Sequence, residues 1–144
     1  MKYSFFVPGI PAPGGSKRFV GFGKKTGRAI LIDSAGEKNK NWRSIVGTVG
    51  SQYCKEMLSG PLRVRFVFKM PRPKYHFDSN GNLKLRSPAY HTTKPDALKL
   101  ARSTEDALTG IAWHDDSQTS ELEIIKEYTG TKAGCHITIE TIDA

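Results

Sequence analysis

The feature that most constrains the fold is an alternating stretch, LRVRFVFK, at residues 62–69. Successive side chains of a β-strand point to opposite faces, so alternation of apolar and charged residues is typical of a half-buried strand. The apolar set is Leu62, Val64, Phe66 and Phe68, and the cationic set is Arg63, Arg65 and Lys69. The sequence therefore predicts a strand with one core face and one cationic face.

A helix is predicted before this strand. Ser34 and Glu37 have the spacing of a capping box, in which each side chain bonds a free N–H at the helix start. Apolar residues then recur at helical intervals: Trp42, Ile45, Val46, Val49, Tyr53 and Met57. Ser59, Gly60 and Pro61 follow, so we expect the helix to end at about Leu58.

A second helix is predicted in KPDALKLARSTEDAL, residues 94–108, with Thr109 and Gly110 at its end. At about 100° per residue its core-facing stripe comprises Ala97, Leu100, Ala101, Thr104 and Leu108. Leu98 lies outside this stripe, beside Arg102 and Glu105, which makes it an unexplained apolar residue on a polar face.

Five further strands are expected: three at residues 3–7, 119–128 and 135–142, and two in a hairpin formed by 18–22 and 28–33 around the turn KKTG. Strands and helices are mixed without a regular βαβ repeat. We therefore predict an α+β fold, a single small domain over residues 1–144 with a mixed β-sheet packed against two main helices.

Charge is distributed unevenly along the 144 residues, whose net charge is +8. Residues 1–94 hold 18 Lys and Arg against 4 Asp and Glu, whereas residues 95–144 hold 4 against 10. A basic region suits nucleic-acid phosphates, although a solvated basic surface is the simpler alternative. We expect a soluble, cytoplasmic protein with no membrane association, because the sequence has no signal peptide or long apolar run. Cys54 and Cys135 are interpreted as core residues.

The segment from Met70 to Lys94 combines prolines, rings and cations, and a turn is expected at Asn80-Gly81. Long irregular segments of this kind are usually functional or mobile, and basic side chains beside rings suit DNA. The alternative is a mobile surface excursion. The predicted DNA-binding residues are Lys17, Arg18, Lys24, Lys25, Arg72, Lys74, Lys84, Arg86 and Lys94.

Three aspartates are candidate functional residues. Asp96 begins the second helix, where a carboxylate also serves as a cap. Asp115 and Asp116 follow in the tight connection IAWHDDSQ, which on composition alone is an exposed turn. Carboxylates gathered in a basic protein nevertheless indicate Mg²⁺-dependent phosphodiester chemistry, with Mn²⁺ as a substitute. The sequence contains no nucleophile elbow, Walker loop or H-E-x-x-H helix.

KPD followed by DAL, and then WHDDSQ, resembles the RusA family of phage-associated Holliday-junction resolvases. PGIPAPGGSKR near the N-terminus, FKMPRPKYH and Trp42-Arg43 add to the resemblance. It implies a homodimeric α+β endodeoxyribonuclease of DNA recombination and repair that binds four-way or branched DNA and makes paired Mg²⁺-dependent cuts. It also implies metal ligation by Asp96, Asp115 and Asp116, with Asp96, Asp116 and Arg102 as the catalytic residues.

Leu98 departs from the family pattern, because it stands where the family has its second motif aspartate. Lys99 replaces the following asparagine, and Arg102 replaces the catalytic lysine. Three outcomes stay open: an enzyme with fewer ligands, with Glu105 as a substitute about 10 Å along the helix, a weakened or metal-shifted nuclease, or a junction-binding protein without cleavage. A further alternative is a basic interaction protein in which the aspartates serve only as helix caps and turn residues.

Lys126 is also of the kind that the family places after the DD turn. Ten residues of extended strand separate it from Asp116, and such a strand spans about 33 Å. We therefore expect Lys126 and Asp116 of one subunit to lie in different places.

Overall fold

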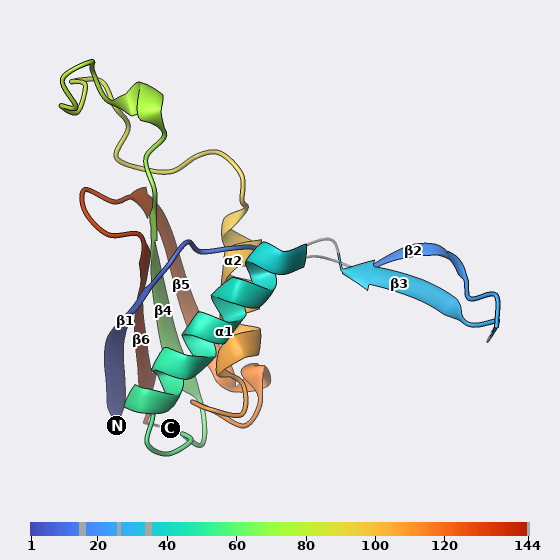
Figure 1. The fold of residues 1–144 in the computed structure, drawn as a ribbon. Coiled ribbons are helices and arrows are strands. Elements are labelled where there is room, and N and C mark those ends of the chain that lie inside the picture. The colour runs from blue at the N-terminus through green and yellow to red at the C-terminus, as the bar shows by residue number, and fades with distance from the viewer. Residues whose placement is uncertain (15–16, 26, 34–35, 144) are drawn as a thin grey trace.

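A mixed four-stranded sheet in the order β1-β6-β4-β5 forms the body of the protein (Figure 1). The computed structural model describes residues 1–14, 17–25, 27–33 and 36–143, and the side chains of these residues apart from 17–20, 22 and 29–33. The strands are β1 (Lys2–Pro8), β4 (Leu62–Met70), β5 (Thr119–Tyr128) and β6 (Gly134–Thr141). β4 pairs with β6 antiparallel and with β5 parallel, so the predicted mixed sheet is confirmed.

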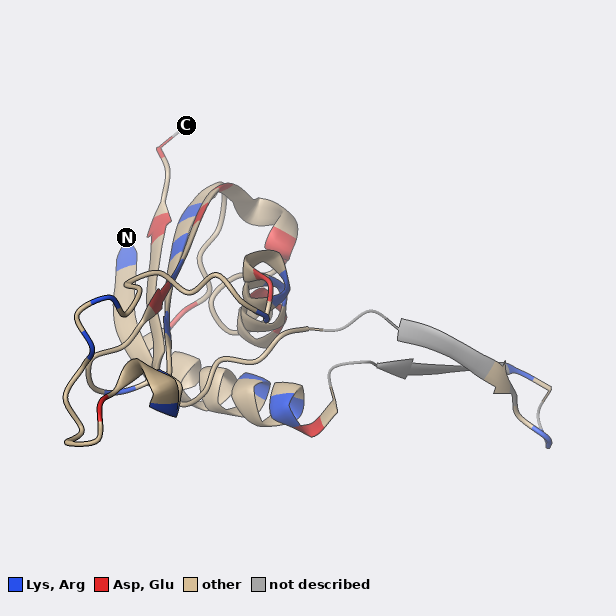
Figure 2. Ribbon diagram, turned by 90° about the horizontal axis from the view of Figure 1, so that it is seen from above, with Lys and Arg blue, Asp and Glu red and all other residues tan. Residues whose placement is uncertain are grey.

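Helices α1 (Gly36–Tyr53) and α2 (Ala97–Leu108) cover the same face of this sheet, which confirms the α+β class (Figures 1 and 2). A hydrogen bond of 3.1 Å from Trp42 Nε1 to Thr104 Oγ1 joins them inside the core. Leu100 and Leu108 are fully buried, as the predicted stripe requires, and Leu98 is 75% exposed. Neither helix is long and apolar enough to cross a membrane, and the described residues contain no other helix that is.

The end of α1 differs from the prediction, because the helix stops at Tyr53 and not near Leu58. The backbone N–H of Leu58 donates to the carbonyl of Ala112 at 2.8 Å, and Leu58 pairs with Trp113 in an isolated β-bridge. This tertiary pairing draws residues 54–58 away from the helix axis. Ser34, the first half of the predicted capping box, lies outside the described residues.

The face of the sheet opposite the helices carries the basic residues of β4 that the alternating pattern predicts. Each of them is paired with a glutamate: Arg63 with Glu121 and Glu140, Arg65 with Glu123, and Lys69 with Glu127. The parallel register of β4 and β5 aligns these residues across the strands. The predicted cationic face is therefore neutralised by the acidic C-terminal part of the chain, and we do not assign it to DNA.

A two-stranded arm, β2 (Lys17–Phe22) and β3 (Ala29–Asp33), extends from the body, as the hairpin pattern predicts (Figure 1). Lys24 and Lys25 are exposed near its tip. The side chains of Lys17 and Arg18 lie outside those that the structure describes, so the predicted roles of these two residues stay predictions.

The excursion of residues 71–93 lies beyond the upper end of the sheet (Figure 1) and is folded onto itself. It contains the 3-10 turn η1 (Lys74–His76) and a bridge between Phe77 and Leu83. The predicted Asn80-Gly81 turn is present, and its backbone N–H groups bond Asp78. The excursion ends against β5, where the His91 N–H donates to the Lys126 carbonyl at 3.1 Å.

Candidate functional site

Asp96 stands immediately before α2, but its carboxylate makes no hydrogen bond to the helix N–H groups. Only the Asp96 backbone carbonyl begins the helix, by accepting from the N–H of Leu100 at 3.0 Å. The exposed carboxylate instead lies 3.9 Å from Lys99 Nζ. The capping interpretation of this side chain is therefore wrong, which leaves its oxygen atoms available for another partner.

Lys126 binds the backbone of the segment that leads into α2. It lies on β5, and its ammonium group donates to the backbone carbonyls of Thr93 and Pro95, both at 2.8 Å. Burial lowers the pKa of Lys126, and the nearby Asp96 carboxylate acts in the opposite direction. Lys126 thus lies near Asp96, at the start of α2. This agrees with the expectation from strand length that Lys126 and Asp116 lie in different places.

One of the two aspartates in the HDDSQ turn, which follows α2, stabilises the turn itself. Asp115 accepts a 2.8 Å bond from the N–H of Ser117, and this bond lowers the pKa of Asp115. Gln118 completes the capping box and donates to the carbonyls of Leu58 and Gly60. Asp115 therefore has a sufficient structural role in η2 (Asp116–Gln118), the short 3-10 turn that it caps.

The charge of Asp116 acts on Glu105, a residue of α2. Glu105 is half-buried, and its pKa is raised first by burial and then by the negative charges of Asp116 and Asp106, while the Thr119 hydroxyl acts in the opposite direction. An effect of this sign requires the carboxylates to lie near each other. The fold thus brings Asp116 within electrostatic range of Glu105, a residue of a separate element.

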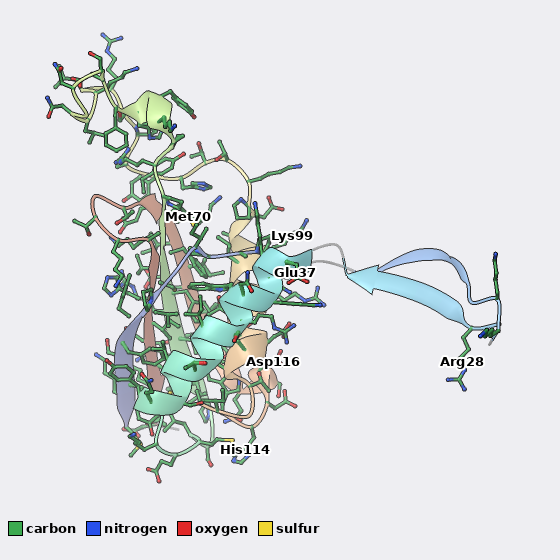
Figure 3. All side chains as sticks on the ribbon, in the orientation of Figure 1. Arg28, Glu37, Met70, Lys99, His114 and Asp116 are labelled. Carbon is green, nitrogen blue, oxygen red and sulfur yellow. The ribbon has the colours of Figure 1, made fainter. Side chains whose placement is uncertain are left out.

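The three predicted metal ligands do not gather at one point. Glu105 follows Asp96 by nine residues, which corresponds to roughly 13 Å along the helix. In Figure 3, Lys99 lies toward the start of α2 and Asp116 lies toward its end. Among the described residues, no group of three or more His, Cys, Asp and Glu side chains is arranged to hold a metal ion. Ligation by Asp96, Asp115 and Asp116 stays a prediction.

Leu98, Arg102 and Glu105 share the solvent side of α2, because residues three or four apart lie on one helix face. Leu98 and Arg102 are exposed there, while Glu105 is half-buried. This face joins the two ends of the candidate site, with Asp96 at its start and Asp116 at its end. A phosphate held along it would meet Arg102 between the two acidic ends.

The predicted DNA-binding residues of the excursion divide into two kinds. Arg72 is built into the fold: its guanidinium lies 5.1 Å from the Tyr128 ring centre and donates to the Pro88 carbonyl at 2.8 Å. Lys74, Lys84 and Arg86 are exposed. Lys94 is also exposed, next to the entrance of α2. We therefore keep these four as surface cations and assign Arg72 to positioning the excursion.

Two residues gain importance from the structure. From the sequence, Glu105 is only a distant substitute for the carboxylate missing at Leu98, and Lys126 is only a residue remote from Asp116. The available signal for Glu105 was its place on the Leu98 face of the helix. No sequence pattern connects Lys126 with Asp96, because their proximity depends on the packing of α2 against β5.

Comparison with known proteins covers nearly the whole chain. The family model for endodeoxyribonuclease RusA matches residues 8–140. A Bacillus subtilis (strain 168) protein described as uncharacterized protein YqaN is 29% identical over 108 residues, which are 73% of this chain and 75% of that protein. The family match includes both acidic motifs, the arm and the excursion. On this evidence the chain belongs to the RusA family of endodeoxyribonucleases.

Proposed function

We propose that this protein is a metal-dependent, structure-selective endonuclease that resolves Holliday junctions and other branched DNA by paired phosphodiester hydrolysis. The proposal is carried by the α2 face that exposes Arg102 and ends at Glu105, a half-buried acid whose pKa is raised by burial and also by the charge of Asp116. The family match supports the endonuclease class. Exposed cations on the arm and the excursion supply the complementary charge for DNA (Figure 2).

The donor set at Asp116 and Glu105 fits a hard divalent cation. Mg²⁺ is commonly held by one or two carboxylates together with water and substrate phosphate, so a pair of acids is sufficient. The raised pKa of Glu105 reflects burial and like-charge repulsion, and a cation placed between the acids relieves that repulsion. Asp96 is retained as a predicted ligand from the family motif, and Asp115 is secondary because it caps η2.

A divalent ion bound here supplies charge neutralisation at the phosphate and activation of water. The chain's own groups do the remaining work. Arg102 stabilises the negative charge that develops on the phosphate oxygens, through a planar guanidinium that can donate to two of them at once. Lys126 organises the segment before α2 through its bonds to the Thr93 and Pro95 carbonyls, so the helix face is presented in one orientation.

Paired cuts at a junction require two sites related by a two-fold axis, and we propose a C₂ homodimer. Lys24 and Lys25 on the arm, together with Lys74, Lys84, Arg86 and Lys94, would contact phosphates on either side of the cut. Phosphate contacts position the protein without reading sequence, which suits recognition of DNA shape.

The direct test is cleavage of a synthetic four-way junction with Mg²⁺ or Mn²⁺. Asp116→Asn should lower the cleavage rate by at least about a hundredfold. Junction binding should persist or tighten, because a negative charge that faces phosphate is removed. Glu56→Gln, which neutralises an exposed acid in the segment after α1, is the matched control and should cut normally. Unchanged cutting by Asp116→Asn would exclude Asp116 as a metal ligand.

Leu98 supports a second candidate function, a junction-binding protein with weakened or lost cleavage. It is 75% exposed on the same face as Arg102 and Glu105, and an apolar side chain cannot ligate a metal. Selective binding of the junction over linear duplex, with no nicks under either metal, would support this function. Leu98→Asp should then restore or increase metal-dependent cutting, and equal affinity for junction and linear duplex would refute both functions.

A further inference from the structure

A mainly apolar groove of about 700 Å³ lies beside the entrance of α2, outside the acidic site. Its lining comes from four parts of the chain: the segment before the arm, the first half of α1, the end of β4 and the residues just before α2. Ile10, Ile45, Met70 and Pro95 represent these parts. Volumes of roughly 300–1,000 Å³ are typical of sites for small organic groups.

The charged groups of the groove all have one sign. Lys38 at the start of α1 and Lys94 before α2 line it, and the described lining contains no carboxylate. Both lysines are exposed. The neutral polar side chains are those of Asn41 and of His91, whose pKa is lowered by burial and by the Lys126 charge. An apolar floor with a cationic rim is complementary to a flat, hydrophobic ring that carries a phosphate.

We propose that this groove binds an unpaired nucleotide of the DNA at the branch point, with its base against the apolar floor and its phosphate between Lys38 and Lys94. The inference rests on the proposed function, because it takes branched DNA as the substrate. Lys94 is two residues from Asp96, so a strand held by this lysine continues toward the exposed face of α2. The site distinguishes a branch from intact duplex because a base must leave its stack to enter.

A nucleotide accounts for both features of the lining. A purely apolar partner would leave the two lysines without a counter-charge, and duplex DNA would leave the floor uncovered because its bases are stacked inside. Single-stranded nucleic acid combines a phosphate for the cations with a base face for the apolar surface. Ile10 is well placed to report on this contact, since it lines the groove and its side chain is 65% exposed.

The test uses the full-length protein and four-way junctions that carry 2-aminopurine at or next to the branch point, in buffer with EDTA and without a divalent metal. The fluorescence of 2-aminopurine rises when the base leaves its stack. The wild-type protein should raise it at the branch point and not at a position within a duplex arm. Ile10→Glu, which adds a negative charge to the floor, should weaken junction binding roughly tenfold and remove the fluorescence change. Met57→Glu is the control, because Met57 is 40% exposed and lies outside the groove.

A second pair of variants isolates the cationic rim. Lys38→Gln should weaken junction binding more than Lys40→Gln, although both remove one charge from exposed positions on α1, because only Lys38 lines the groove. Equal losses would mean that the effect is general electrostatics, and the proposal would fail. It would also fail if Ile10→Glu changed the sedimentation of the free protein from dimer to monomer, since the groove would then be a subunit interface.

Failure of this proposal is distinguishable from failure of the catalytic one. A branch-specific fluorescence rise without any cutting in Mg²⁺ or Mn²⁺ supports the nucleotide site and refutes catalysis. Efficient cutting without a fluorescence rise refutes the nucleotide site and leaves the endonuclease standing.

Discussion

Replacing Lys126 by methionine removes an ammonium group but keeps a side chain of similar length and its apolar packing. The wild-type group donates to the carbonyls of Thr93 and Pro95, both at 2.8 Å. A hydrogen bond from a charged donor contributes about 1.5–3 kcal/mol. One of these carbonyls is exposed and regains water when the lysine is lost. We therefore expect Lys126→Met to lower the free energy of unfolding by about 2 kcal/mol.

Urea unfolding monitored by circular dichroism measures this change, and a shift of about 1 M in the midpoint is expected. Lys132→Met is the matched control, because Lys132 is exposed in the turn between β5 and β6 and its loss removes the same charge. In a junction assay, Lys126→Met should lower the maximal cleavage rate more than the affinity, since Asp96 loses its positioning while most DNA contacts remain. If the two variants unfolded within about 0.5 kcal/mol of each other, the role assigned to Lys126 would be refuted.

Three further results are expected. In the absence of DNA, Mg²⁺ at ten times its Kd should stabilise the protein by about 1.4 kcal/mol, or roughly 4 °C in Tm, and Glu105→Gln should reduce this shift. Calorimetry that shows no shift for wild type would contradict the metal site. Gly50→Ala should destabilise by about 1–2 kcal/mol in urea melts, because the new Cβ would lie 2.8 Å from Leu108 Cδ2 in the buried contact between α1 and α2. Burial lowers the pKa of His76 and His91. Below about pH 6.5 the unfolded chain therefore binds more protons than the folded one, and stability should fall as the pH drops toward 5.5. A double His→Gln variant should flatten that dependence.

The two helices show which features hydrophobic periodicity can predict and which it cannot. The stripe on α2 and the exposure of Leu98 could be predicted, because a helix repeats every 3.6 residues and the apolar positions all appear within 12 residues. The end of α1 could not be predicted. Met57 continues the apolar spacing, yet Leu58 pairs with Trp113 from a distant part of the chain. Periodicity describes one element at a time. It does not reveal that a distant segment can pair with the same residues and end the helix.

The uneven charge of the chain was visible in the sequence, but its meaning was not. Arg63, Arg65 and Lys69 count as basic residues in any window, and the structure pairs each of them with a glutamate of β5. Arg72 is likewise held against Tyr128. Which cations remain for DNA depends on the register between strands that are about 60 residues apart.

The sequence by itself determined the α+β class, the two acidic motifs and the family, because these depend on local patterns and on residue identity. Only the tertiary structure decided which charged groups meet. It places Lys126 against the entrance of α2 near Asp96, and Glu105 near Asp116 at the other end. The physical reason is that electrostatic effects act through space over a few ångströms. A helix and a parallel strand bring such groups together or separate them regardless of their distance along the chain.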